Sequence, residues 1–181
     1  MHYNLGNALY LVEQIEDAVK HYQQAIQLNP KKPESFYNLG NALCVKSDYQ
    51  HAISSYQQAI DLDPKNAPAY YNLGNAYYML NQYEEAVKTY LKALELNPFS
   101  AECHFNLASA YNDMGKLQKA SEHYEKSIEH DEGNIDAFLC LAAVKEQLGE
   151  KSEAAILYKS VLDKDPGNEK AKEALKKMAR A

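Results

Sequence analysis

The pattern of apolar and small positions repeats every 34 residues along the chain. In each copy a leucine is followed directly by glycine or alanine, and farther on an alanine is followed four positions later by a tyrosine. The second spacing places both side chains on one face of an α-helix, so each copy is predicted to hold two helices. The leucines are Leu5, Leu39, Leu73, Leu107 and Leu141; the alanines are Ala18, Ala52, Ala86, Ala120 and Ala154; and the tyrosines are Tyr22, Tyr56, Tyr90, Tyr124 and Tyr158.

Proline marks the end of four of the five copies. It cannot continue an α-helix, and it pushes the residue before it out of the helical region. In the third copy the pattern predicts a first helix from Pro68 to about Leu80 and a second helix over residues 83–96. The terminal prolines are Pro30, Pro64, Pro98 and Pro166, and Glu132 stands in the corresponding position of the fourth copy.

The fold predicted from this pattern is all-α, with eleven helices joined by short loops. Five helical hairpins follow one another, and a final amphipathic helix covers the last apolar face. A single hairpin cannot bury its apolar face, so neighbouring hairpins must supply the core. The predicted boundaries are 1–32, 33–66, 67–100, 101–134 and 135–168 for the hairpins, and 169–181 for the capping helix.

The glycines of the first three copies predict where helices pack closely. Gly6, Gly40 and Gly74 leave the first helix of each hairpin without bulk on the side that faces the second helix. We therefore expect Gly40 and Gly74 to lie at close contacts between helices.

The sequence Tyr-Asn-Leu-Gly-Asn-Ala begins at Tyr3, Tyr37 and Tyr71. The third copy carries the fuller pattern Tyr70, Leu73, Gly74, Tyr77, Ala86, Tyr90 and Pro98. This pattern resembles the tetratricopeptide repeat (TPR) family, whose 34-residue signature has tryptophan where this chain has tyrosine or another residue. The resemblance implies a right-handed superhelical solenoid in which the first helices line a concave groove. It also implies a non-catalytic scaffold that binds an extended or helical peptide in that groove.

Asparagine and aromatic residues occupy the positions that this resemblance places in the groove. An asparagine amide offers both a hydrogen-bond donor and an acceptor, so it can pair with a peptide backbone whatever the side chains of the peptide. Two other interpretations stay open: the asparagines brace the hairpins, and the aromatic row is partly core. The predicted peptide-binding residues are Tyr37, Asn38, Asn41, Tyr71, Asn72, Asn75, Tyr78, Phe105 and Asn106.

Two subtypes of the family suggest different ligands. Co-chaperones that bind acidic carboxyl termini need basic residues on successive first helices, but Pro68 and Glu102 are among the residues at those positions. The repeats of O-linked N-acetylglucosamine transferase hold substrates with an asparagine ladder, to which Asn4, Asn38, Asn72 and Asn106 are similar. Cys140 interrupts this ladder. The similarity of the four asparagines still implies an alternative function. In it the chain is a substrate-recognition array of a glycosyltransferase-type enzyme whose catalytic domain lies outside this chain.

The charge and hydropathy of the chain limit its partners. Its 181 residues carry a formal net charge of −6, which provides no basic field to attract nucleic acid or anionic lipid. We expect a protein or peptide partner that is neutral or basic, because like charges across a groove oppose encounter. No apolar run approaches the roughly 18 residues of a membrane span, and no leader is evident. Three cysteines without a close pairing favour a reducing compartment, so an intracellular, cytoplasmic location is expected.

No motif predicts catalysis, a cofactor or a metal site. The seven glycines lie in repeat positions or turns and form no phosphate-binding loop. The cysteines and histidines lack the Cys-x-x-Cys and His-x-x-x-His spacings of zinc sites. We therefore predict no enzyme activity, no catalytic or metal-binding residue and no cofactor.

The first copy begins inside its first helix, which suggests a piece of a larger protein. Without a preceding repeat, Tyr3, Leu5 and Leu9 would lack their natural cover. Because a large exposed apolar patch favours association, we expect self-association through this end.

Overall fold

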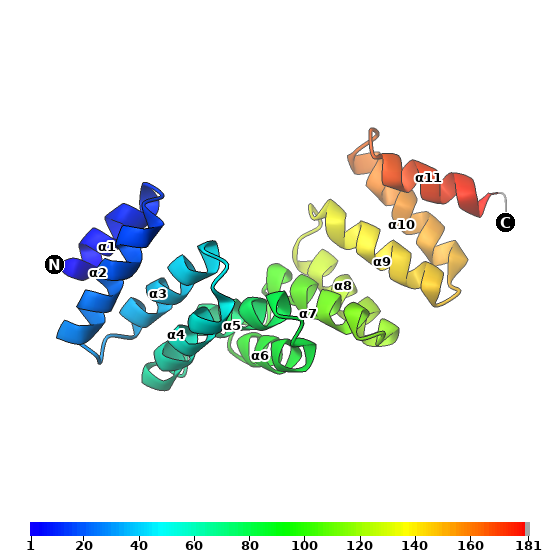
Figure 1. Ribbon diagram of the computed structural model, residues 1–181. Coiled ribbons are helices and arrows are strands. Elements are labelled where there is room, and N and C mark those ends of the chain that lie inside the picture. The colour runs from blue at the N-terminus through cyan, green and yellow to red at the C-terminus, as the bar shows by residue number, and fades with distance from the viewer. Residues whose placement is uncertain (180–181) are drawn as a thin grey trace. The chain divides into compact units, whose positions relative to one another are not determined.

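The computed structural model describes residues 1–179, and over these residues it is all-helical, with eleven helices and no strand (Figure 1). The all-α fold of successive helical hairpins predicted from the sequence is confirmed. The helices are α1 (His2–Leu11), α2 (Ile15–Leu28), α3 (Pro33–Val45), α4 (Tyr49–Leu62), α5 (Ala67–Met79), α6 (Tyr83–Leu96), α7 (Ala101–Asp113), α8 (Leu117–His130), α9 (Ile135–Gln147), α10 (Lys151–Lys164) and α11 (Glu169–Met178).

The chain forms two compact units. The first comprises residues 1–98 and holds three hairpins, α1 to α6; the second begins at Phe99 and holds α7 to α11. Within this second unit α11 packs on α10 through Ala171, Leu175 and Met178, as expected of a capping helix. Arg180 and Ala181, the last two residues of the predicted capping helix, lie outside the described residues. Every helix within residues 1–179 is too short or too polar to cross a lipid bilayer.

The close contacts expected at the glycines are present, and tyrosine rings make them. A Cβ atom added to Gly40 would lie 2.6 Å from the ring of Tyr56, and one added to Gly74 would lie 2.5 Å from the ring of Tyr90. Both rings are almost fully buried. Glycine is therefore needed in these hairpins because the tyrosine of the second helix lies flat against the backbone of the first.

Each hairpin turns through one residue with a left-handed backbone conformation. Gly115 and Gly149 adopt it in the second unit with φ of +70° and +82°. In the first unit Glu13, Ser47 and Asn81 adopt it with φ near +60°, although this conformation is unfavourable for residues with a side chain. The turn is therefore set by the packing of the two helices and not by glycine alone.

The first helices lie on the inner side of the first unit. Helix α1 contacts α3, and α3 contacts α5, which brings the first helices together on one side. At the amino end of this face Leu5 is 44% exposed, while Tyr3 and Leu9 are partly buried against the core. Self-association through this end stays a prediction.

Candidate functional site

A chain of hydrogen bonds joins the first hairpin to the second and the second to the third. The hydroxyl of Tyr22 on α2 donates to Asn7 Oδ1 on α1 at 2.9 Å. Asn38 on α3 donates from Nδ2 to the same oxygen at 2.9 Å and to the hydroxyl of Tyr3 at 3.2 Å. Two tyrosines and two asparagines thus link both helices of one hairpin to the first helix of the next. We call this set the Tyr-Asn-Asn relay.

The same relay recurs one repeat later. The hydroxyl of Tyr56 donates to Asn41 Oδ1 at 2.8 Å. Asn72 donates from Nδ2 to Asn41 Oδ1 at 3.0 Å and to the hydroxyl of Tyr37 at 3.1 Å. In the third hairpin the hydroxyl of Tyr90 donates to Asn75 Oδ1 at 2.7 Å. The bracing role that the sequence left open for the asparagines is therefore realised for these residues.

Bracing uses only part of each amide. Both Nδ2 hydrogens of Asn38 and of Asn72 are used in the relay, and Asn41 Oδ1 accepts two bonds. Among the described residues, Asn38 Oδ1, Asn72 Oδ1 and Asn41 Nδ2 make no hydrogen bond. We call Asn38, Asn41, Asn72 and Asn75 the asparagine ladder of the first unit. Its unused groups are the Oδ1 atoms of Asn38 and Asn72, which can accept, and the Nδ2 group of Asn41, which can donate. These groups could pair with the N–H and C=O of a polypeptide backbone.

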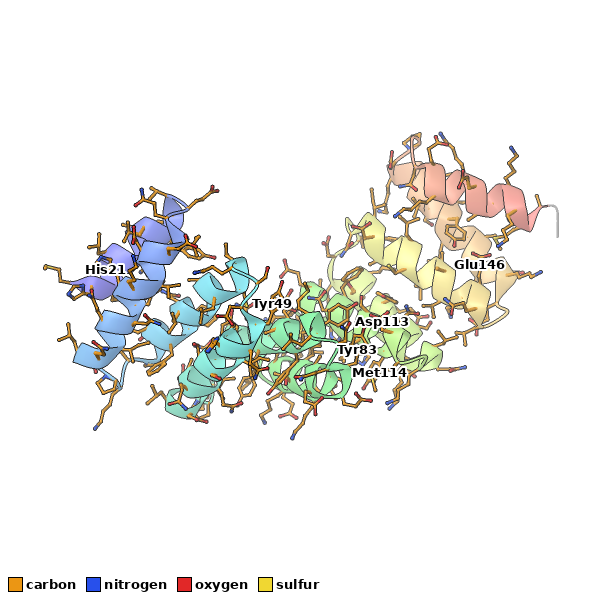
Figure 2. The ribbon with its side chains drawn as sticks, viewed as in Figure 1. His21, Tyr49, Tyr83, Asp113, Met114 and Glu146 are labelled. Atoms are coloured by element: carbon orange, nitrogen blue, oxygen red, sulfur yellow. The ribbon has the colours of Figure 1, made fainter. Side chains whose placement is uncertain are left out.

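The aromatic row of the first helices is half-buried. The ring of Tyr37 packs against that of Tyr56 with centroids 6.0 Å apart, and Tyr71 packs in the same way against Tyr90 at 6.1 Å. Tyr78 packs against Tyr83, which begins α6 (Figure 2), with centroids 5.5 Å apart. The row therefore contributes to the core and also keeps partly exposed edges.

Two hollows in the first unit are lined in part by the asparagine ladder. One measures about 230 Å³ and is bordered by Asn7, Tyr10, Leu11, Tyr22, Asn38 and Asn41. The other measures about 340 Å³ and is bordered by Tyr10, Asn41, Cys44, Val45, Tyr56, Asn72 and Asn75. No charged side chain borders either hollow. Burial raises the pKa of the Cys44 thiol, which keeps this residue neutral as well.

The structure brings only some of the predicted site residues together. Four asparagines, Asn38, Asn41, Asn72 and Asn75, border the two hollows, whereas the three predicted tyrosines do not. Sequence reasoning missed Tyr10, Leu11, Cys44 and Val45, although their 34-residue spacing was a usable signal. Phe105 and Asn106 lie on α7 of the second unit, where Phe105 packs against Tyr124 with centroids 5.5 Å apart.

The second unit replaces the relay with other partners. In the fourth hairpin Ser109 stands in the position of Asn41, and its hydroxyl lies 3.0 Å from that of Tyr124. In the fifth hairpin this position is Ala143, which has no acceptor. Tyr158 instead donates to Glu146 on α9 (Figure 2) at 2.8 Å, and burial together with this carboxylate raises the pKa of Tyr158. The face of the first helices therefore changes from amide-rich in the first unit to partly acidic in the second.

A cluster of charged side chains in the second unit forms a network of ion pairs. Lys145 bridges Glu125, Glu150 and Glu153 at 3.2, 2.8 and 2.9 Å, which joins α8, α9 and α10. These carboxylates raise the pKa of Lys145. Within residues 1–179, no three His, Cys, Asp or Glu side chains gather as a metal ion would need.

Comparison with known sequences identifies the repeat. A family described as TPR repeat matches residues 6–44, 40–81 and 74–115, and one described as tetratricopeptide repeat matches residues 101–134. Together these matches run from residue 6 to residue 134. No curated protein sequence is significantly similar to the chain.

Solved structures share the fold over nearly the whole chain. A crystal structure of MamA protein is similar with a TM-score of 0.87 and 28% identity, and the match covers 91% of this chain and 90% of MamA. YrrB, described as a TPR protein with an unusual peptide-binding site, has a TM-score of 0.85 and 26% identity over 97% of this chain and 90% of YrrB. PilF of Pseudomonas aeruginosa has a TM-score of 0.83 at 22% identity, over 99% of this chain and 82% of its own. The repeat pattern, the helical hairpins and these matches place the chain in the tetratricopeptide repeat family.

Proposed function

We propose that this protein is a non-catalytic interaction scaffold whose first unit binds a peptide on the face of α1, α3 and α5. The observation that carries this proposal is the partly used asparagine ladder, which borders hollows of about 230 and 340 Å³. YrrB, a similar structure, is described as having a peptide-binding site. Within the first unit the proposed contacts are Tyr37, Asn38, Asn41, Tyr71, Asn72, Asn75 and Tyr78. Phe105 and Asn106 occupy the equivalent repeat positions on α7 of the second unit, and their part in binding stays a prediction.

The partner is proposed to be neutral or weakly basic where it enters the hollows. A charged side chain there would lose water without gaining an opposite charge, since no charged residue borders either hollow. The net charge of −6 disfavours a strongly acidic partner at longer range. The ladder's similarity to that of transferase-associated arrays stays a prediction.

A peptide library tests the proposal directly. Random twelve-residue peptides displayed on phage are selected against the full chain, and the affinities of the enriched peptides are measured by fluorescence anisotropy. Tyr71→Ala and Asn72→Ala should each weaken binding by about 1 kcal/mol or more, because each removes a buried contact or a hydrogen bond. Lys88→Ala on the outer helix α6 should leave the affinity unchanged.

Folding must be separated from binding, because Asn72 also braces α3 against α5. Circular dichroism melts of each variant identify any loss of structure, and affinities are compared below the lowest melting midpoint. If binding survives both inner-face changes and is lost with Lys88→Ala, the site lies on the outer helices and the proposal is wrong.

A further inference from the structure

A row of exposed apolar side chains runs along the carboxyl ends of the first helices in the first unit. Leu11, Val45 and Met79 follow one another at intervals of 34 residues and are 81%, 56% and 54% exposed. The equivalent residues of the second unit are polar, Asp113 and Gln147. We call Leu11, Val45 and Met79 the apolar ridge. The apolar ridge lies in the unit that carries the asparagine ladder, and contiguous exposed apolar surface marks an interaction site. Leu28, Leu62 and Leu96 form a second row of the same period at the ends of the outer helices, but they border neither hollow.

The apolar ridge and the ladder belong to the same surface. Leu11 borders the smaller hollow together with Asn7, Asn38 and Asn41. Val45 borders the larger hollow together with Asn41, Asn72 and Asn75. Each hollow therefore combines unused backbone-like hydrogen-bonding groups with an apolar edge and carries no charge. A ligand that matches both features needs an accessible main chain on one side and uncharged apolar side chains on the other.

The spacing of the repeats selects the conformation of that ligand. Helices α1 and α3 contact each other directly, and packed helices lie about 8 to 10 Å apart. A polyproline II segment advances about 3.1 Å per residue with three residues per turn, so side chains on one face recur at about 9 Å. In a β-strand the side chains on one face recur at about 7 Å, because successive residues alternate at about 3.3 Å each. The polyproline II interval falls within this range, whereas the β-strand interval falls below it.

The unused hydrogen-bonding groups of the asparagine ladder also favour a polyproline II ligand. An α-helical ligand could place side chains seven residues apart, about 10.5 Å, along the ridge. Its N–H and C=O groups, however, are bonded within the helix. A polyproline II segment has no internal hydrogen bonds, so its backbone remains available to Asn38, Asn41 and Asn72.

We propose that the first unit recognises an uncharged polyproline II segment that carries an apolar residue at every third position. The apolar side chains contact Leu11, Val45 and Met79, and the backbone pairs with the ladder. This inference rests on the proposed peptide-binding function and specifies the ligand for it.

Blocked synthetic peptides test the spacing on the full chain. The probe is acetyl-(Leu-Pro-Gln)₄-amide with a fluorescent label, measured by anisotropy. One comparison peptide has the same composition with its leucines clustered at one end, and another is an alanine-rich helical peptide with leucines seven residues apart. The probe should bind at least about tenfold more tightly than either comparison peptide, since each factor of ten reflects about 1.4 kcal/mol.

Matched substitutions test the surface. Leu11→Asp introduces the charge that Asp113 carries in the second unit, and it should weaken binding of the probe about tenfold or more. Leu28→Asp is the control, because Leu28 is 75% exposed at the end of the outer helix α2. It should leave the affinity unchanged. Both positions are exposed, so thermal melts should change little for either variant.

The outcomes separate this inference from the proposed function. If the library peptides bind and depend on Asn72 while the probe binds no better than its clustered version, the spacing inference is overturned and the peptide-binding function stands. Tighter binding of the helical peptide also overturns the inference. Equal loss of probe binding with Leu11→Asp and Leu28→Asp, or no loss with either, removes the apolar ridge as the contact surface.

Discussion

At the scale of single residues, two buried hydroxyls within residues 1–179 lack a hydrogen-bond partner. Ser35 and Ser127 are fully buried, and neither Oγ makes a hydrogen bond. Ala69 and Ala137 take the position of Ser35 in the third and fifth repeats, and Ala59 and Ala93 take that of Ser127 in the second and third. The repeat packing therefore fits a methyl group at both places. Each hydroxyl loses its hydrogen bonds to water on folding without gaining a partner, which lowers the free energy of unfolding.

Ser127→Ala should accordingly stabilise the protein by about 1 kcal/mol, since an unsatisfied buried polar group costs about 1 to 3 kcal/mol. Urea unfolding followed by circular dichroism measures the change. The control is Ser55→Ala, because the buried Ser55 hydroxyl donates to the His51 carbonyl at 2.9 Å. Ser55→Ala should give no gain. Equal effects of the two substitutions would contradict the explanation.

At this scale the sequence predicted the close helix contacts correctly, because only glycine lets a neighbouring side chain approach the helix backbone so closely. A glycine after the repeated leucine left room for a neighbouring helix, and Gly40 and Gly74 are found there. It could not assign the amide of Asn38, because an asparagine can donate or accept equally well. The choice depends on Asn7 and Tyr3, one repeat earlier, which occupy the donors of Asn38 and leave its oxygen.

At the scale of helices, the first helix of most hairpins is fixed by a side chain just before it. Asn66, Ser100 and Asn134 each accept a hydrogen bond from a backbone N–H in the first turn of the first helix that follows. Asn168 does the same for the capping helix α11. Lys32, before α3, makes no such bond. The second helices begin without one in most hairpins, so tertiary packing holds their first turns.

Asn134→Ala should lower the free energy of unfolding by about 1 kcal/mol, because it removes the acceptor for the first turn of α9. Asn134 Oδ1 accepts from the Ala137 N–H at 3.0 Å. Gln14 precedes α2 and makes no side-chain cap bond, so Gln14→Ala serves as the control with little expected change. Hydrogen exchange of the first turn of α9 should accelerate in Asn134→Ala alone.

The helix boundaries show how far the pattern determines an element. The second helix of the third repeat spans Tyr83–Leu96 as predicted, because the proline after it gives a clear stop. The first helix was predicted to start at Pro68 and reach about Leu80, but it spans Ala67–Met79. Its capping bond, from the Ala69 N–H to Asn66, sets the start. No proline marks its end.

At the scale of the whole molecule, stability is expected to depend on a histidine pair in the second unit. His104 on α7 and His123 on α8 stack with Nδ1 atoms 3.1 Å apart, and His123 also stacks on Tyr111. Burial lowers the pKa of His123 to about 4, and repulsion from His104, Lys126 and Lys119 adds to this. The folded protein therefore favours neutral His123.

The contribution of neutral His123 to the free energy of unfolding should be fully present above about pH 6.5, which is the pKa of a histidine in an unfolded chain. It should be lost as the pH falls from there toward about 4, because the unfolded chain then binds a proton that the folded chain does not. Melting midpoints measured across this range should become lower as the pH is lowered. His123→Leu, which copies Leu157 of the fifth repeat, should flatten the dependence. An unchanged pH dependence in this variant would rule out His123 as its source.

The repeat number, the hairpin architecture and the family could all be predicted from the sequence, because a 34-residue period admits few folds. The division into two units after Pro98 could not, since the period continues through it without a change in spacing. The apolar ridge was likewise missed. Leu11 and Val45 look like core residues in a helical pattern, and only the fold shows that they face outward.

The Tyr-Asn-Asn relay also bears on how such a chain could change its length. Asn72 bonds Asn41 and Tyr37 just as Asn38 bonds Asn7 and Tyr3, with distances that agree within 0.1 Å. A duplicate of residues 33–66 inserted after the original would therefore meet on each side the partners it already has. Gene duplication in steps of 34 codons could therefore lengthen the first unit with the relay intact at the new junction, whereas an insertion inside a first helix that shifts its register would turn its asparagine away from its acceptor.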